Sequence, residues 1–78
     1  MLRYELVENT DEYVKYKYYP DNQKTFGVVV VSKGNHTILE QEIATNDELK
    51  WYFFKMFKRI KEFISKNHFE EEGIIAWY

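Results

Sequence analysis

The sequence contains no cysteine, one proline and three glycines among its 78 residues. The absence of cysteine excludes disulfides, thiolate zinc sites and a cysteine nucleophile. Long apolar runs are absent too, since the longest aliphatic run, Val28 to Val31, is far too short to span a bilayer. A chain of this size buries a modest fraction of its surface, so an ordinary apolar core gives it only marginal stability. Such chains are usually reinforced, and large side chains are one means.

Recognisable catalytic motifs are also absent. The sequence has no Ser-His-Asp arrangement, no glycine-rich phosphate loop and no HExxH pattern. Residues 1–8 alternate polar and apolar side chains and do not resemble a signal peptide. We therefore expect a cytoplasmic, non-enzymatic protein with no cofactor, no catalytic or metal-ligating residues, no small-molecule substrate and no membrane contact.

Aromatic residues are the abundant class, at 19% of the chain. Each buried ring removes roughly 150–250 Å² from water, so aromatic side chains can stabilise a small core. Their number exceeds what one core layer easily holds. We expect some rings to be exposed or to be buried against another molecule.

Charge is distributed unevenly along the chain, whose net charge is −2. Residues 46–67 carry six basic and three acidic side chains, whereas residues 1–45 and 68–78 are both net acidic. A basic segment on an acidic body is typical of a binding face, and equally of a solvated helix that complements its neighbours.

Alternating polar and apolar residues, separated by turn-forming clusters, predict five strands. Their ranges are 2–8, 13–19, 25–32, 36–44 and 74–78. The valine run in the third predicts a central strand covered on both faces. In the fourth, Leu39 is expected on the face opposite Glu40. Gly34 lies in the turn between these two strands and is expected to adopt a positive φ.

A long amphipathic helix is predicted after the fourth strand. Thr45 and Glu48 have the spacing of a capping box, and Asn67 can take the left-handed position at the other end. Apolar side chains between these ends recur at steps of three and four residues and form one stripe. The stripe contains Leu49, Tyr52, Phe53, Met56, Phe57, Ile60, Phe63 and Ile64.

These elements predict a single α+β domain over residues 1–78, with the element order β-β-β-β-α-β. The helix returns along the sheet, so the fifth strand runs antiparallel to the first. Pairing of these two strands gives a five-stranded, mostly antiparallel sheet in the order 5-1-2-3-4, with the helix on one face. The alternative places the fifth strand beside the fourth through a right-handed crossover.

The face of the sheet away from the helix is the first candidate site, because one helix cannot cover both faces. An apolar, tyrosine-bearing face suits a protein partner or a twofold homodimer. It is also compatible with a solvated face of tyrosines and lysines. The residues expected there are Tyr13, Tyr19, Val29, Val31 and Trp77.

The outer side of the helix is the second candidate site, since Trp51 and Phe54 fall off the apolar stripe. Aromatic rings among lysines suit a protein contact, or stacking on nucleic acid with contacts to phosphate. The alternative is a purely structural role, in which Trp51 packs under a terminus or loop and lysine stems cover Phe54. The surface comprises Trp51, Phe54, Lys55, Lys58 and Lys61.

His68 with Glu70, Glu71 and Glu72 has the side chains of a metal site, but the spacing matches no established site. We interpret this segment as a solvated acidic loop. His36 follows a turn and has no neighbour in the sequence to orient it, so we interpret it as a surface residue.

Three segments resemble a group of short, uncharacterised proteins of low-GC Gram-positive bacteria and their mobile elements. They are Tyr18-Tyr19-Pro20-Asp21, Phe26-Gly27-Val28-Val29 and the ending Glu71 to Tyr78. The resemblance implies a bacterial, cytoplasmic, non-enzymatic protein and brings no site residues. The leading hypothesis is therefore an interaction domain that self-associates or binds a protein through its open sheet face, and nucleic-acid binding through the helix is the alternative.

Overall fold

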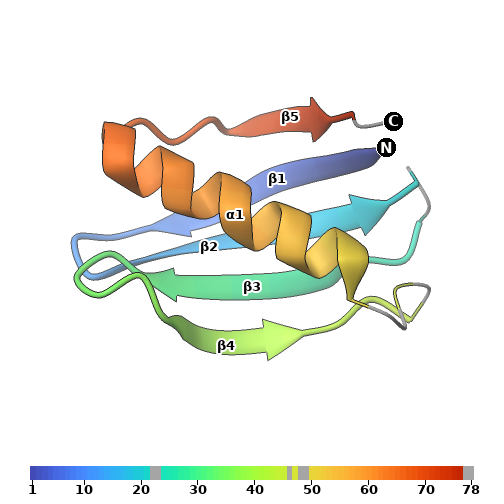
Figure 1. The fold of residues 1–78 in the computed structure, drawn as a ribbon, viewed down its shortest axis with the longest axis horizontal. Helices are drawn as coiled ribbons and strands as arrows, with labels where there is room; N and C mark the ends of the chain where they lie inside the picture. The colour runs from blue at the N-terminus through green and yellow to red at the C-terminus, as the bar shows by residue number, and fades with distance from the viewer. Residues whose placement is uncertain (22–23, 46, 48–49, 77–78) are drawn as a thin grey trace.

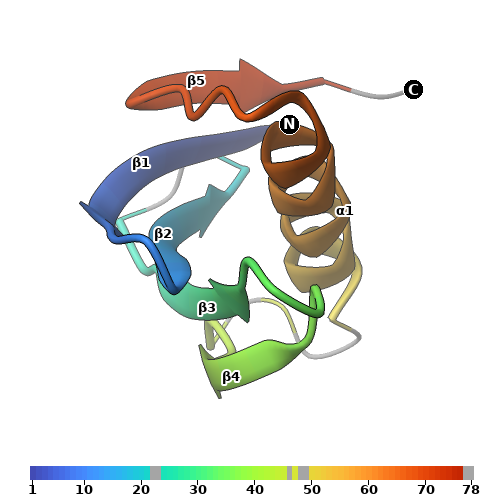
Figure 2. The same ribbon diagram turned by 90° about the vertical axis from the view of Figure 1, so that its left-hand side faces the viewer.

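The computed structural model describes residues 1–78 except 22–23, 46, 48–49 and 77–78. The described elements are β1 (Leu2–Asn9), β2 (Tyr13–Pro20), β3 (Gly27–Ser32), β4 (Ile38–Glu42), α1 (Trp51–Lys66) and β5 (Glu72–Ile75). The strands form one sheet in the order β4-β3-β2-β1-β5, and every neighbouring pair is antiparallel. Helix α1 crosses one face of this sheet (Figures 1 and 2). The predicted α+β architecture and strand order are confirmed, and the crossover alternative is wrong.

The last strand begins earlier than predicted. Glu72 pairs with Glu5, and the ladder continues to Ile75, which pairs with Leu2. The acidic residues before Gly73 had indicated a loop, but the outer edge of β1 offers them backbone partners. The beginning of β1 and the end of β5 consequently lie side by side (Figure 1).

Three tyrosines form the centre of the core between the sheet and α1. Tyr4, Tyr16 and Tyr18 come from β1 and β2 and are almost completely buried. The rings of Tyr4 and Tyr16 meet edge to face at 5.7 Å, and both lie within 6 Å of the Phe63 ring. This is the geometry that aromatic quadrupoles favour, so the predicted aromatic stabilisation is present.

Each buried tyrosine hydroxyl has a hydrogen-bond acceptor. Tyr4 donates to the Glu70 carboxylate at 2.5 Å, and Tyr16 donates to the Glu70 carbonyl at 2.7 Å. Burial, reinforced by the Glu70 carboxylate, raises the pKa of Tyr4 to about 12. Burial likewise raises the pKa of Tyr16. Glu70 is exposed in the loop before β5, as predicted, but it also accepts hydrogen bonds from two tyrosines of the core.

The helix faces the core as predicted but begins later. Phe53, Met56, Ile60 and Phe63 are buried, and the stripe continues with the half-buried Tyr52, Phe57 and Ile64. Leu49 and Glu48 lie outside the described residues. Asn67 adopts the predicted left-handed conformation, with φ 52°, and its backbone N–H bonds to the end of the helix.

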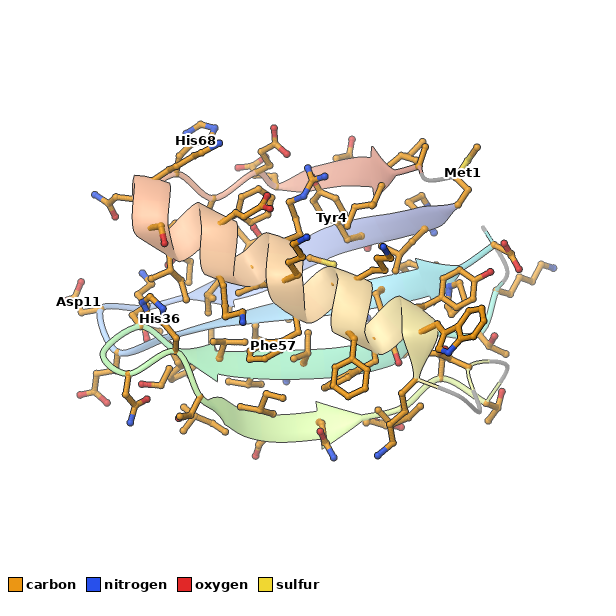
Figure 3. All side chains as sticks on the ribbon, in the orientation of Figure 1. Met1, Tyr4, Asp11, His36, Phe57 and His68 are labelled. Atoms are coloured by element: carbon orange, nitrogen blue, oxygen red, sulfur yellow. The ribbon has the colours of Figure 1, made fainter. Side chains whose placement is uncertain are left out.

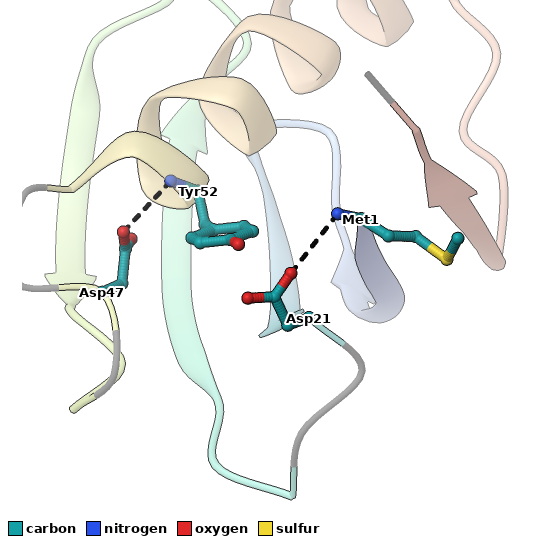
Figure 4. Close-up of polar contacts among 4 residues, drawn as sticks. All are labelled: Met1, Asp21, Asp47 and Tyr52. Atoms are coloured by element: carbon teal, nitrogen blue, oxygen red, sulfur yellow. Dashed lines mark hydrogen bonds and ion pairs between the residues drawn. The ribbon is translucent and has the colours of Figure 1, made fainter. Parts of the chain in front are cut away.

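The predicted capping box at Thr45 is wrong, because Asp47 takes that role. Lys50 has left-handed φ of 60° and precedes the first helical residue, Trp51. The buried carboxylate of Asp47 accepts the backbone N–H of Tyr52 at 3.1 Å (Figure 4) and that of Phe53 at 2.8 Å. Tyr18 donates its hydroxyl to the same carboxylate at 3.3 Å. The helix start is thus tied to the middle of the sheet.

The turn between β3 and β4 also differs from expectation. His36, rather than Gly34, has positive φ, at 59°. The N–H of His36 bonds to the carbonyl of Ser32 at 2.9 Å, so the chain makes a wider turn than a two-residue hairpin loop.

Asp21, which directly follows β2, forms an ion pair at 3.5 Å with the amino terminus of Met1 (Figure 4).

Candidate functional site

The open face of the sheet carries a different set of residues from the one predicted. Val29 and Val31 pair with Tyr16 and Val14 and are 0% exposed in the core under α1. Placing these two valines on the open face was therefore wrong, because a run of four valines carries no alternation that fixes which face each one takes. Val28 and Val30 occupy the open face instead, and Trp77 lies outside the described residues.

Tyr13 and Tyr19 do lie on the open face, and both already have partners within the chain. Tyr13 donates its hydroxyl to Glu8 at 2.5 Å, and hydrogen bonding to this carboxylate raises the pKa of Tyr13. The guanidinium of Arg3 lies 4.0 Å from the centre of the Tyr19 ring, and that ring packs against Phe26 at 5.7 Å. Arg3 is also paired with Glu5. These contacts indicate that much of this face is a solvated network of amphipathic side chains.

One part of the open face is hollow, and sequence reasoning missed it. The hollow has a volume of about 360 Å³, and we call it the acidic hollow. Its lining residues are Glu8, Tyr13, Lys15, Val30, Leu39 and Glu40.

Leu39 lines the acidic hollow because of a β-bulge. Val31 pairs with Ile38 and Val30 pairs with Glu40, so Leu39 is the extra residue of β4. The bulge breaks the alternation that had assigned Leu39 and Glu40 to opposite faces. Leu39 is 54% exposed as a result.

The outer side of α1 carries the second candidate surface, and here the exposed rings are confirmed. Trp51 is 65% exposed and Phe54 is 55% exposed. The Phe54 ring meets the buried Phe53 ring edge to face at 5.5 Å, which holds Phe54 in place at the surface. The alternative, with Trp51 under a terminus or loop and lysine stems over Phe54, is therefore wrong for the described part of the chain.

Lys55 and Lys58 join these rings around an open groove of about 320 Å³. The four residues are spaced by three and four positions, so they form one stripe. That stripe lies opposite the buried stripe of Phe53, Met56, Ile60 and Phe63, and it points away from the sheet. We call the stripe of Trp51, Phe54, Lys55 and Lys58 the helix face.

Lys61 does not belong to the helix face, because its ammonium lies 4.7 Å from the centre of the Phe57 ring. A smaller hollow of about 170 Å³ adjoins the groove instead. Lys55, Lys58 and Arg59 line it together with Ile75 from the end of β5. Three basic side chains thus extend from the helix face toward the edge of the sheet, with one acidic neighbour, Glu62, which is paired with Arg59 at 3.5 Å.

Neither histidine belongs to a candidate catalytic or metal site within the described residues. His68 is exposed and follows α1, and His36 is exposed on the β3–β4 turn (Figure 3). No group of three or more metal-ligating side chains lies together in the described part of the chain. Glu70 is committed to Tyr4 and Tyr16, and Glu72 is part of β5.

Within the described ranges, no helix is both long enough and apolar enough to cross a membrane.

Searches among protein-family models, curated proteins and solved structures found no match for this chain. The geometry of the two surfaces is therefore the basis for inferring a function.

Proposed function

We propose that this chain is a small non-enzymatic interaction domain that binds a protein partner through the helix face. One observation carries the proposal: Trp51 and Phe54 are exposed side by side on the outer stripe of α1, next to Lys55 and Lys58. Tryptophan is enriched among the residues that dominate binding energy at protein interfaces. Isolated exposed apolar residues are ordinary, but two adjacent rings around a groove are typical of a contact surface.

The energetics indicate what kind of partner is needed. Burying one large apolar side chain stabilises a complex by roughly 1.5–3 kcal/mol. Association costs an estimated ~4–15 kcal/mol, so two rings alone do not hold a partner. Lys55 and Lys58 border the same groove and can supply the rest through contacts with carboxylates. A partner with acidic groups around an apolar centre satisfies both requirements.

The open face of the sheet, predicted as the main contact surface, is the weaker candidate for an outside partner. Val29 and Val31 are buried under α1, and the hydroxyls of Tyr13 and Tyr19 already bond to Glu8 and Glu5. A partner would have to replace these contacts. The free energy gained on binding there would be smaller than at the helix face.

The groups with displaced pKa support a non-enzymatic role. Burial raises the pKa of Tyr18 to about 12, and hydrogen bonding to Asp21 raises that of Tyr52 to about 12. Hydrogen bonding to Tyr52 lowers the pKa of Asp21. These groups act within the fold, and none lines the helix groove.

We further propose a cytoplasmic location, which fractionation of host cells would test.

Nucleic acid is a second candidate partner, because bases stack on exposed rings while lysines contact phosphate. The net charge of −2 weighs against it, since phosphate binding depends on an excess of cationic charge. Titration with single-stranded and double-stranded oligonucleotides at low salt separates the two candidates. In a Trp77→Phe variant, Trp51 is the sole tryptophan, and unchanged fluorescence would exclude nucleic acid.

The proposed function is tested by affinity capture from host lysate with and without nuclease. We expect the wild-type chain to retain a protein partner after nuclease treatment and the Trp51→Ala/Phe54→Ala variant to lose it. Trp51 and Phe54 are exposed, so this variant should keep its fold, which circular dichroism can verify.

Ile74→Thr is the matched control for this experiment. It also shortens an exposed apolar side chain, but on β5 and away from the helix face. The control should capture the same partner as the wild type. The same proteins on wild type and double variant would contradict the proposal, and so would capture that depends entirely on nucleic acid.

A further inference from the structure

We propose that the partner of the helix face is the acidic hollow of a second copy of this chain, which gives head-to-tail self-association. The inference rests on the proposed function, because it assigns an occupant to the same helix face. It is carried by the complementarity of two surfaces on one molecule, in charge and in apolar character.

The helix face supplies a basic, aromatic projection. Trp51 and Phe54 project from the stripe of α1 that points away from the sheet, and Lys55 and Lys58 flank them. No acidic side chain lines this groove among the described residues. The surface thus combines two rings with cationic charge.

The acidic hollow supplies the matching concave surface. Its apolar part consists of Val30, Leu39 and the ring of Tyr13, and Glu8 and Glu40 border it. Lys15 lies opposite Glu8 in the β1–β2 ladder, and Glu8 also accepts the Tyr13 hydroxyl. With Glu40, the hollow carries two carboxylates and one ammonium.

The acidic excess extends along β4. A second hollow adjoins the first and is lined by Lys15, Val28, Glu40, Gln41 and Glu42. Glu40 and Glu42 give β4 two carboxylates that can meet Lys55 and Lys58 of another copy. Opposite potentials on the two surfaces would orient the encounter and fix its register.

The positions of the two surfaces determine the form of the assembly. Figure 2 shows that α1 covers one face of the sheet and leaves the other open. The helix face lies on the stripe of α1 away from the sheet, whereas residues of the uncovered sheet face line the acidic hollow. The two surfaces therefore point in opposite directions. A contact between unlike surfaces of this kind is heterologous, so it leaves one free surface at each end and can continue to a third copy. A closed twofold dimer would require each surface to pair with itself, which brings like charges together.

The test is sedimentation velocity of the full chain over a wide concentration range. We expect the wild-type sedimentation coefficient to rise with concentration and to fall again as salt is added. Trp51→Ala/Phe54→Ala removes the two projecting rings of the helix face. Leu39→Lys/Glu40→Lys reverses the charge of the acidic hollow. Each variant alone should associate at least roughly tenfold more weakly than the wild type.

Mixing the two variants is the decisive measurement. The hollow variant keeps its helix face and the helix variant keeps its hollow, so the mixture should form 1:1 dimers that do not grow. Glu72→Lys/Ile74→Lys replaces one glutamate and one exposed aliphatic residue by lysine at the opposite edge of the sheet, and it serves as the matched control. This control should associate as the wild type does.

Three results would overturn the inference. A wild-type chain that stays monomeric at the highest concentration excludes a second copy as the partner. Association that survives in the hollow variant shows that the helix face uses another surface, and a mixture without dimers excludes the pairing of the two surfaces. If the chain is monomeric yet captures a different protein through Trp51 and Phe54, the inference fails while the proposed function stands.

Discussion

At the scale of single residues, Asp47 shows how one side chain determines where an element begins. Its carboxylate is 3% exposed and accepts the N–H groups of Tyr52 and Phe53, which have no partners within the helix. Spacing favours Thr45, and only the left-handed turn at Lys50 brings Asp47 to the helix start. That turn depends on tertiary packing, so local pattern could not reveal it.

We predict that Asp47→Ala destabilises the fold by about 1–2 kcal/mol, because the variant leaves two helix N–H groups and the Tyr18 hydroxyl without their acceptor. Thr45→Ala is the control, since Thr45 is exposed and should change the free energy of unfolding by less than about 0.5 kcal/mol. Urea denaturation of the two variants measures the difference. Equal losses would mean that Asp47 does not cap the helix in solution.

At the scale of elements, the sequence predicts where the strands lie. It predicts only in part which side chains of each strand face the core. Alternation in β2 correctly places Tyr16 and Tyr18 in the core and Tyr13 and Tyr19 outside. The uniform valines of β3 hold no such information, so their faces follow from pairing with β2. The bulge at Leu39 is likewise a product of pairing with β3. This is why the helix face could be named from sequence, whereas the acidic hollow could not.

The glycines provide a test at the ends of β3. A Cβ atom on Gly27 would lie 2.3 Å from the Tyr18 ring and 2.6 Å from the Glu42 carbonyl oxygen. We predict that Gly27→Ala costs about 1–3 kcal/mol through overpacking. Gly34 has no positive φ, and the nearest atom to its added Cβ is 3.8 Å away. Gly34→Ala should therefore be neutral or stabilise by about 0.4–1 kcal/mol.

Thermal unfolding of these two variants, followed by circular dichroism, checks the glycine prediction. A melting temperature that falls equally in both variants would contradict the close approach of Gly27 to Tyr18. A clear loss for Gly34→Ala alone would instead indicate that the turn adopts the left-handed glycine conformation in solution.

At the scale of the whole molecule, the tyrosine-rich core makes the folded state less stable at alkaline pH. The folded pKa values of Tyr4 and Tyr18, at about 12, lie above the ordinary value of about 10. The unfolded chain therefore releases these protons first as pH rises. Their contribution to stability is complete below pH ~10 and is lost as pH rises toward ~12.

We predict that the free energy of unfolding falls steeply between pH 10 and pH 12. Urea denaturation at pH 8 and at pH 11 measures this decline, and absorbance at 295 nm follows tyrosine ionisation directly. Tyr16→Phe should flatten the decline, because it removes one hydroxyl whose pKa is raised by burial. Equal stability at the two pH values would contradict the role of the buried hydroxyls.

The pairing of β1 with β5 has a consequence for synthesis of the chain. β1 is synthesised well before β5, and its outer edge receives its partner only when residues 72–75 emerge from the ribosome. Until then the nascent sheet exposes a row of unpaired backbone groups along β1, a template for pairing with another chain. Residues 72–75 therefore protect β1 from aggregation, and a chain truncated before residue 72 would leave that edge open.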